Sequence, residues 1–433
     1  EDKIRVGIVG EIYIKYAQQL VDEGKAYYAF DTSDELELMR ATSENDSFKY
    51  GPESRMTMRN SESLSVEETE ALMAIGNFAI RMKIPTGETI SFEDEIRGLV
   101  SFESSELDDK IILKGDGMPT YHLANIVDDH LMKITHVIRG EEWLSSTPHH
   151  VLLYRFLGWE YTMPTFSHLP LILKPNGNGK LSKRDGAKFN MPVFPLSWPH
   201  HEEENYDGER FTGFREAGFL PEAVINFLAL LGWNPGTDQE IFSIEELTEA
   251  FSLEKINKSG ARFDFEKAKW FNHQYIQQKS DAELAALIQP DLKARGITAD
   301  TKFVEKFCSL MKSRINVLTE FATVGYYFFT EELNYDEANI QKKWNVDVAP
   351  KWQEVIRYIE NAEMADHQSM EANFKTFLAE AGYKPGEILP LMRLALAGTM
   401  QGPGVFEMVE LLGRENVILR MNNAVQAFNK ILN

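Results

Sequence analysis

The stretch Leu169-Pro-Leu-Ile-Leu-Lys-Pro-Asn-Gly-Asn-Gly-Lys-Leu-Ser-Lys-Arg-Asp-Gly186 decides what we expect of this chain. Its apolar beginning predicts a buried strand, and Gly177 and Gly179 predict a loop after that strand. Within nine positions there follow four cations and a serine: Lys180, Lys183, Arg184, Lys188 and Ser182. A mobile basic loop that carries a hydroxyl suits a polyphosphate whose charge shifts during a reaction. A solvated basic turn is the plainer interpretation of the same residues.

The residues on either side favour the chemical interpretation. The glycines and lysines of this stretch do not have the G-x-x-x-x-G-K-[ST] spacing of a P-loop. Instead, Lys180-Leu-Ser-Lys-Arg184 resembles the second signature of class I aminoacyl-tRNA synthetases, usually written K-M-S-K-S. With Asp185-Gly186 after it, the form is similar to that of glutamyl-tRNA synthetases. The resemblance extends from about Glu11 to the C-terminus.

This resemblance implies an α/β Rossmann-like catalytic domain, N-terminally incomplete in this sequence, with an inserted α+β acceptor-binding domain and an all-α anticodon-binding region. The family begins with a strand and an H-I-G-H-like signature, whose histidines stabilise the activated ATP. The sequence contains no such motif, and Glu1-Asp2 resembles the end of the family's R-I-E-D-T segment. A protein that began at Glu1 is therefore expected to fold poorly and to form no adenylate.

Composition limits the class of protein. The 433 residues are enough for two to four domains. Taken alone, the net charge of −22 argues against binding to nucleic acid. Any basic surface that binds phosphates must therefore be local. The single cysteine, Cys308, excludes an internal disulfide and a multi-cysteine zinc site, and it fits a reducing cytoplasm. No signal peptide or bilayer-spanning apolar run is found, so we expect a cytoplasmic protein with no membrane partner.

Periodicity and turn residues predict the secondary structure. A helix is expected around residues 12–21, with Gly24 just after its end, and a shorter one near 34–40. Strands are expected at residues 26–30, 81–85, 96–102 and 134–140. Thr147 and Pro148 predict a helix start, with Thr147 as the N-cap. Further helices are expected at 221–232 and after a capping box at 243–246, and the chain from about residue 280 reads as all-helical.

The resemblance divides the chain into five parts. Residues 1–30 are expected to belong to the incomplete catalytic domain, and 31–120 to the inserted domain that grips the tRNA acceptor end. The second catalytic half, with the K-L-S-K-R loop, is expected at 121–190. A stem-contact domain is expected at 191–305 and a helical anticodon-binding domain at 306–433.

Two groups of residues are candidates for the amino-acid site. Tyr121, Asn125 and Asp128-Asp129 fall on one helical stripe, which is typical either of a pocket or of a satisfied buried network. Arg139 and the following Glu141, Glu142 and Trp143 stand just beyond a predicted strand. Open α/β sheets bind ligands at the carboxyl ends of their strands. The pair His149-His150 is expected to be structural, because adjacent residues of a helix point in different directions.

Roles for these residues are implied by the family. Tyr121, Asn125 and Arg139 would bind glutamate, since a guanidinium can bind a carboxylate through two hydrogen bonds. The expected catalytic residues are Lys180, Ser182, Lys183 and Arg184, with Lys183 on the triphosphate. The ATP site would also include Glu142, Trp143, Ile172 and Leu173, the last two through backbone contacts to adenine.

Contacts to tRNA are expected from scattered cations, although solvated surface residues would look the same in the sequence. Arg59, Arg81 and Lys83 are the candidates near the acceptor end. Arg314, Lys342 and Lys343 are the candidates in the helical half.

The resemblance therefore implies a glutamate–tRNA ligase that forms AMP from ATP in protein biosynthesis. Its partners would be tRNA(Glu), L-glutamate and ATP, with Mg²⁺ held through the phosphates, no zinc, and a monomeric state. One alternative is a relaxed or glutaminyl-type synthetase that acts on tRNA(Gln), because an amide pocket can also hold an arginine. Another is a non-catalytic tRNA-binding protein, which the missing first signature would favour.

Overall fold

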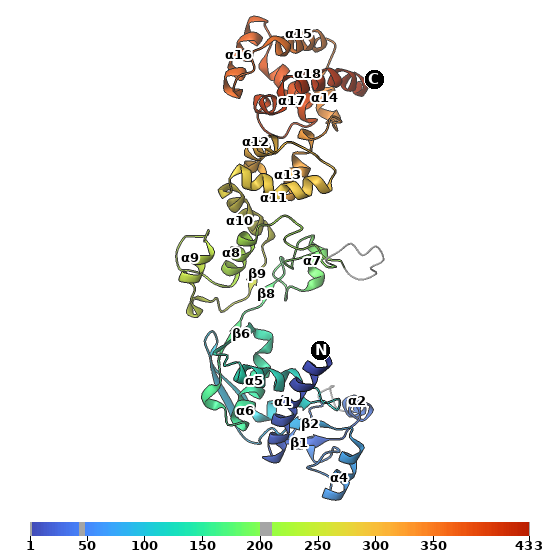
Figure 1. Ribbon diagram of the computed structural model, residues 1–433, viewed down its shortest axis with the longest axis vertical. Coiled ribbons are helices and arrows are strands. Elements are labelled where there is room, and N and C mark those ends of the chain that lie inside the picture. The colour runs from blue at the N-terminus through green and yellow to red at the C-terminus, as the bar shows by residue number, and fades with distance from the viewer. Residues whose placement is uncertain (1, 43–47, 200–209, 433) are drawn as a thin grey trace. The chain divides into compact units, whose positions relative to one another are not determined.

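The computed structural model describes residues 2–42, 48–199 and 210–432, and the chain forms two compact units (Figure 1). The first unit contains Glu1–Lys180, Leu231–Asp238 and Ala250–Arg262. The second unit contains Leu181–Leu230, Gln239–Glu249 and Phe263–Asn433. This division is coarser than the five parts expected from the sequence, whose boundaries remain predictions.

The first unit begins with a helix on a small antiparallel sheet. Helix α1 (Asp2–Asp22) buries Ala17 and Leu20 completely, and Gly24 follows its end at a φ of 67° that favours glycine. The sheet has the order β1-β2-β5, with β1 at Ala26–Ala29, β2 at Ala79–Met82 and β5 at Ile111–Leu113. Three helices lie in the chain between β1 and β2: α2 (Ser33–Thr42), α3 (Pro52–Arg55) and α4 (Val66–Ile75).

A second sheet of four strands carries the candidate site. Its order is β4-β3-β7-β6, formed by Gly98–Glu103, Thr89–Asp94, Thr165–Leu169 and His136–Gly140. Strands β3, β7 and β6 are parallel, whereas β4 returns antiparallel to β3. Because β3 and β4 come before residue 120 and β6 and β7 after it, strand pairing crosses the predicted boundary at 120/121.

Helices α5 (Tyr121–Leu131) and α6 (Thr147–Phe156) pack against each other in this unit. Leu123, Ile126 and Leu152 are completely buried in the shared apolar cluster. The structure corrects the start of α6, because Ser146 is the N-cap and Thr147 the first helical residue.

The stretch from Leu169 is also corrected. The predicted single buried strand is two short strands: β7 ends at Leu169, and β8 (Ile172–Leu173) pairs with β9 (Ala261–Arg262). Pro170 lies between them and has no N–H to donate to a ladder. Ile172 is 40% exposed, so the second strand is not buried.

The second unit is mostly helical and confirms the expectation for the chain beyond residue 280. Its helices are α7 (Lys183–Phe189), α8 (Pro221–Gly232), α9 (Ile244–Ala250), α10 (Phe265–Gln278), α11 (Asp281–Ala294), α12 (Thr301–Met311), α13 (Thr319–Val324), α14 (Glu337–Lys343), α15 (Val348–Asn361), α16 (His367–Glu380), α17 (Pro385–Ala397) and α18 (Val405–Leu432). The chain has 3-10 turns at Ser104–Glu106, Glu141–Ser146, Glu160–Thr162, Leu253–Lys255, Lys312–Arg314 and Tyr326–Phe328.

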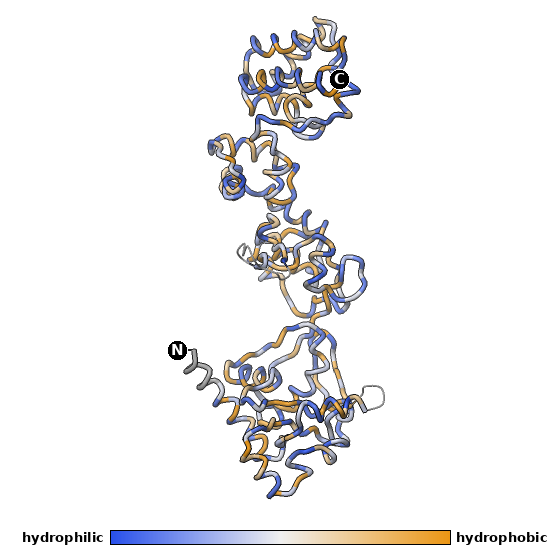
Figure 2. The backbone as a smooth tube through the Cα atoms, turned by 90° about the vertical axis from the view of Figure 1, so that its right-hand side faces the viewer, coloured by the Kyte–Doolittle hydropathy of each residue, from blue (hydrophilic) through white to orange (hydrophobic). Residues whose placement is uncertain are grey.

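An aromatic core holds the C-terminal helices together. Figure 1 shows α17 and α18 side by side, and α15 and α16 also contact α18. Trp344, Trp352, Phe374 and Phe428 are buried between these helices. Apolar and polar stretches alternate along the helices in Figure 2, as amphipathic helices around a core require. None of the described helices combines the length and apolar character needed to cross a membrane.

A buried ion pair ties together the first unit near its small sheet. Asp109 is completely buried, and its carboxylate accepts hydrogen bonds from Arg55 Nε at 2.8 Å and Nη2 at 2.9 Å. It also accepts from the Tyr27 hydroxyl at 2.6 Å and the Ile84 N–H at 2.9 Å. Four donors therefore offset the cost of burying the carboxylate.

Arg81 belongs to the same buried region. Its guanidinium lies 3.9 Å from the centre of the Tyr50 ring and donates to the Asp109 carbonyl at 2.7 Å. Only 8% of the residue is exposed. This position favours a structural role over the RNA contact expected from the sequence, because a phosphate cannot reach a buried guanidinium.

Replacing Asp109 should destabilise the first unit strongly. In Asp109→Asn an uncharged amide would face four donors and leave the Arg55 charge uncompensated, at a cost of roughly 3–5 kcal/mol. Thermal unfolding followed by circular dichroism should show a lower melting temperature. The matched control is Glu35→Gln, which removes the exposed Arg59–Glu35 pair of the same unit and should cost under about 1 kcal/mol. Equal effects of the two substitutions would contradict this account.

Candidate active site

Arg139 is the centre of the candidate site. It stands near the end of β6, directly opposite His168 in the parallel register of β6 and β7. Its Nε donates to His168 Nε2 at 3.1 Å, and its Nη2 donates to Thr147 Oγ1 at 2.9 Å. At the more exposed edge of the guanidinium, Nη1 donates to the Tyr121 hydroxyl at 2.9 Å. Among the described residues, neutral side chains make all its hydrogen bonds and no carboxylate forms an ion pair with it.

Helix α5 brings the predicted pocket residues to Arg139. Tyr121, the first residue of the helix, is 42% exposed, and its ring centre lies 4.6 Å from that of Trp143. One turn later, Asn125 donates to the Asp129 carboxylate at 2.9 Å. Burial raises the pKa of Asp129 above its usual value. Within the predicted polar stripe, Tyr121 is therefore hydrogen-bonded to Arg139, and Asn125 is hydrogen-bonded to Asp129.

A group of histidines lies behind the Arg139 side chain. His150 is completely buried, and its Nδ1 lies 3.4 Å from both Nη1 and Nη2 of Arg139, while its Nε2 is 3.2 Å from His122 Nδ1. Burial lowers the pKa of His150 well below its usual value and that of His122 to about 4. Both rings are therefore neutral near pH 7 and add no positive charge beside the guanidinium. The neighbouring His149 is also buried and contacts the Asp108 carbonyl at 3.0 Å.

Of the predicted ATP residues of the first unit, Ile172 and Leu173 form β8 and Glu142 is connected to it through Lys180, whereas Trp143 packs against Tyr121. Lys180 is bridged to Leu173 across a turn, in which Gly177 and Gly179 adopt φ angles of 78° and 83°. The Lys180 ammonium contacts the Glu142 carboxylate at 2.5 Å, and this hydrogen bond lowers the pKa of Glu142. These two residues are therefore brought together, as a shared nucleotide site requires.

The neighbouring Glu141 contacts Arg97 and the backbone before β8. Its carboxylate accepts the Leu171 N–H at 3.2 Å and pairs with the Arg97 guanidinium. Glu141 thus fixes the backbone just before β8.

The rest of the basic motif belongs to the second unit and forms a helix where a loop was expected. Helix α7 begins at Lys183, directly after Ser182. The Ser182 N–H and hydroxyl both donate to the Asp185 carboxylate, at 2.8 and 2.6 Å. The expectation of a mobile loop was wrong from Lys183 onward, because this S-x-x-D pair closes the first helical turn. Arg184 is exposed on the same turn, and the Lys183 side chain lies outside what the structure describes.

The remaining tRNA candidates are surface residues. Arg59 and Lys83 form ion pairs with Glu35 and Glu62 respectively. In the second unit, Arg314 is exposed at the end of a 3-10 turn. Lys342 and Lys343 occupy the last turn of α14, where cations are favoured by the helix dipole.

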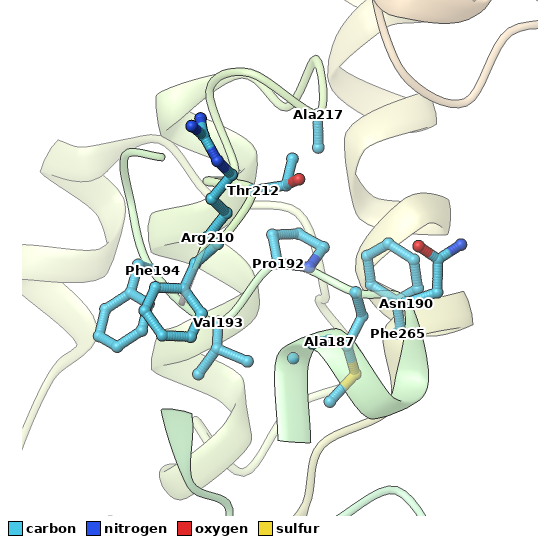
Figure 3. Close-up of a pocket in the computed structure, with 12 residues that line it drawn as sticks. Ala187, Asn190, Pro192, Val193, Phe194, Arg210, Thr212, Ala217 and Phe265 are labelled. Carbon is cyan, nitrogen blue, oxygen red and sulfur yellow. The ribbon is translucent and has the colours of Figure 1, made fainter. Parts of the chain in front are cut away.

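A pocket of about 230 Å³ lies beside α7 in the second unit. Ala187 of α7 and Asn190, which follows the end of α7, line it together with Pro192, Val193 and Phe265 (Figure 3). It contains none of the residues predicted to act on a substrate. The sequence-based site and this pocket are thus different places, and we follow the charged groups because they carry the chemistry.

Three supporting residues of Arg139 were missed in the sequence: Asp94, Thr147 and His168. They lie 45, 8 and 29 positions from Arg139 in the chain. Thr147 was assigned only a capping role, and His168 stands inside an apolar run. The signal of Asp94 and His168 appears only once β3, β7 and β6 are aligned in one sheet, whereas Thr147 reaches Arg139 from the start of α6.

Two family models match the chain. The catalytic-domain model for class I tRNA synthetases (E and Q) matches residues 9–196 and 209–270. A model for an anticodon-binding domain matches residues 283–425. The α/β part and the helical part thus correspond to the two kinds of domain that the sequence predicted.

Whole proteins match over most of their length. A glutamate–tRNA ligase of Bacteroides fragilis is 50% identical over 96% of this chain and 82% of its own length. One of Parabacteroides distasonis is 49% identical over the same shares. The crystal structure of a glutamate tRNA ligase from Elizabethkingia meningosepticum, in complex with its amino acid, is 41% identical. It superposes with a TM-score of 0.89 over 97% of this chain and 83% of its own. The chain therefore belongs to the glutamate–tRNA ligase family of class I aminoacyl-tRNA synthetases.

Proposed function

We propose that this protein joins L-glutamate to tRNA(Glu) at the expense of ATP. The observation that carries the proposal is Arg139, a half-buried guanidinium whose hydrogen bonds within the described chain go only to neutral groups. A carboxylate ligand would balance this charge and gain charge-assisted hydrogen bonds. The relatives found support glutamate over the glutaminyl and non-catalytic alternatives, since they are glutamate–tRNA ligases.

The glutamate side chain is expected at the exposed edge of Arg139, where Tyr121 is already hydrogen-bonded. Asn125 lies one helical turn from Tyr121 and supplies a further amide to the same wall. A glutamine substrate would bring a neutral carboxamide and leave the guanidinium charge unbalanced. The positive charge of Arg139 would therefore select glutamate over glutamine.

The reaction has two steps. The α-carboxylate of glutamate attacks the α-phosphorus of ATP, which forms glutamyl adenylate and releases pyrophosphate. The terminal ribose hydroxyl of tRNA then attacks the acyl carbon, loses its proton, and releases AMP. Chemistry of this kind depends on positioned charge more than on a covalent nucleophile from the protein.

The nucleotide would lie by the basic motif. We assign Lys183 to the triphosphate, with Lys180 and Arg184 in support and Ser182 capping the helix that carries Lys183 and Arg184. Ile172 and Leu173 would hold adenine through the backbone, next to Glu142 and Trp143. Mg²⁺ would come with ATP and be held by phosphate oxygens, whose charge it would neutralise. Among the described residues, no three or more His, Cys, Asp or Glu side chains are grouped as metal ligands.

The remaining proposals concern partners and compartment. The tRNA would contact Arg59 and Lys83 with its acceptor end, and Arg314, Lys342 and Lys343 with its anticodon half. We propose a monomer in the cytoplasm. Cys308 is buried, and burial raises the pKa of its thiol to about 12. The thiol is therefore not exposed to oxidants.

Arg139→Gln should weaken glutamate binding far more than ATP binding. Loss of a hydrogen bond between charged partners costs roughly 1.5–3 kcal/mol, so the KM for glutamate should rise about 10–100-fold. Steady-state aminoacylation by the full-length protein, with each substrate varied in turn, measures both constants. Arg295→Gln, the same change at an exposed pair with Asp291, serves as the control. Equal weakening of glutamate and ATP would remove Arg139 from the amino-acid pocket.

Lys183→Ala should slow adenylate formation. The expected loss is ~10²–10³-fold in the rate of ATP–pyrophosphate exchange, the scale of one electrostatic contact to a transition state. Exchange should be measured with and without tRNA. Lys188→Ala removes a lysine from the last turn of the same helix and should change the rate little. If Lys183→Ala exchanges at the normal rate, the basic motif takes no part in the chemistry.

Binding of tRNA should weaken steeply as salt is added. Each phosphate contact releases counterions and contributes roughly −0.9 to the slope of log K against log salt. Replacing Lys342 and Lys343 together by alanine should make this slope shallower by about 1–2. The double variant with arginine at both positions keeps the charge and should keep the slope. An affinity independent of salt would contradict an electrostatic RNA surface.

A further inference from the structure

Three residues from three adjacent parallel strands form a buried chain of hydrogen bonds. Asp94 ends β3, His168 lies in β7, and Arg139 lies in β6. The Asp94 carboxylate is 2.6 Å from His168 Nδ1, and His168 Nε2 is 3.1 Å from Arg139 Nε. Asp94 is 2% exposed and His168 is completely buried. The chain therefore runs from the interior of the sheet to the guanidinium.

The directions of these bonds follow from the chemistry of the groups. Arg139 Nε can only donate, so His168 Nε2 must accept and carry no proton. The Nδ1 of the same ring must then be the protonated nitrogen, which donates to Asp94. Burial lowers the pKa of His168 and so favours this neutral ring. A carboxylate next to a histidine commonly selects the tautomer in this way.

Asp94 is itself held in one orientation. Its Oδ1 accepts the backbone N–H groups of Ile96 at 3.0 Å and Arg97 at 2.9 Å. Its Oδ2 accepts both the ring of His168 and the backbone N–H of the same residue, the latter at 3.1 Å. One oxygen is therefore assigned to the β3–β4 turn and the other to His168.

We propose that the Asp94–His168 pair positions the arginine that recognises glutamate, and that it thereby sets the affinity for the amino acid. The inference rests on the proposed function of Arg139. Arg139 Nε and Nη2 meet His168 and Thr147 on the buried edge of the guanidinium. The Thr147 hydroxyl is also 3.1 Å from His168 Nε2, so the two supports contact each other. The exposed edge then faces the substrate in one orientation. Asp94 and His168 are positioning residues and do not touch the substrate.

The substitution Asp94→Asn tests the direction of the hydrogen bonds that link Asp94, His168 and Arg139. The new amide oxygen would keep the place of Oδ1, because two backbone N–H groups point to it. The amide nitrogen would then face His168 Nδ1 and donate to it. The proton of the ring would move to Nε2 and oppose the N–H of Arg139. Two donors cannot bond, so the arginine should lose its orientation.

The experiment measures KM for glutamate and for ATP in aminoacylation of tRNA by the full-length protein. For Asp94→Asn we expect the KM for glutamate to rise about 10–100-fold, by analogy with the hydrogen-bond partners that orient metal-binding histidines. The KM for ATP should change less than about threefold. Glu93→Gln makes the same chemical change on the exposed face of the same strand and should leave both constants unchanged. If Asp94→Asn has the same KM for glutamate as the unchanged protein, the inference is overturned.

A structural role would look different. If Asp94 only stabilised the fold, fewer active molecules would lower kcat and leave both KM values alone, and that result would overturn the inference. If Asp94→Asn fails to fold, two variants of His168 test the inference instead. His168→Gln keeps an acceptor within reach of Arg139, and His168→Leu removes it. The KM for glutamate should be clearly lower in His168→Gln, and equal values in the two variants would overturn the inference.

Histidine nitrogen chemical shifts give a readout independent of activity. The ¹⁵N spectrum should show a neutral His168 protonated at Nδ1, and in Asp94→Asn the proton should be on Nε2. A His168 ring protonated at Nε2 before any substitution would overturn the inference. Failure of the proposed function is distinguishable, because the unchanged protein would then not charge tRNA with glutamate. A protein that charges normally but shows none of these effects would refute only the positioning role.

Discussion

The parallel register of β6 and β7 is the constraint on which the candidate site depends. It sets Arg139 opposite His168, at the carboxyl end of the sheet where open α/β folds bind ligands. On the other side of β7, strand β3 brings Asp94 into the same layer. A shift of one residue in this register would turn the Arg139 side chain to the other face of the sheet. The geometry around Arg139 thus begins with the pairing of two short strands.

The same sheet controls the charge of the site. Arg139 is surrounded by tyrosine, threonine and histidine, and burial keeps those histidines neutral. Arg55 shows the opposite arrangement, since its buried guanidinium is fully paired with Asp109. One arginine is thus neutralised within the fold, whereas the other has no carboxylate partner among the described residues. The difference between a structural and a recognition arginine lies in the residues around it, not in the arginine.

Sequence patterns predicted what depends on near neighbours. The period of α1 and α8, the Ser243–Glu246 capping box and the strand that ends near Arg139 were readable, because each signal lies within a few residues. The Ser182-x-x-Asp185 pair that starts α7 was also readable, yet the basic residues between them led to the prediction of a loop. By contrast, the partnership of Asp94 with His168 spans 74 positions and could not be seen before the strands were aligned. Arg81 illustrates the same limit, because Tyr50 and Asp109, which bury it, are distant in the chain.

The buried Asp109 carboxylate also has a consequence for the order of folding. Its donor Tyr27 lies 82 positions away in the sequence, and Arg55 lies 54 positions away. Helices α2 and α4 can form from local contacts, but the antiparallel sheet is complete only when this long segment has closed on itself. Closing it costs chain entropy before any of the four hydrogen bonds is gained. Contacts of such high sequence separation slow folding, and until they form, the unpaired strands of this sheet are open to aggregation and proteolysis.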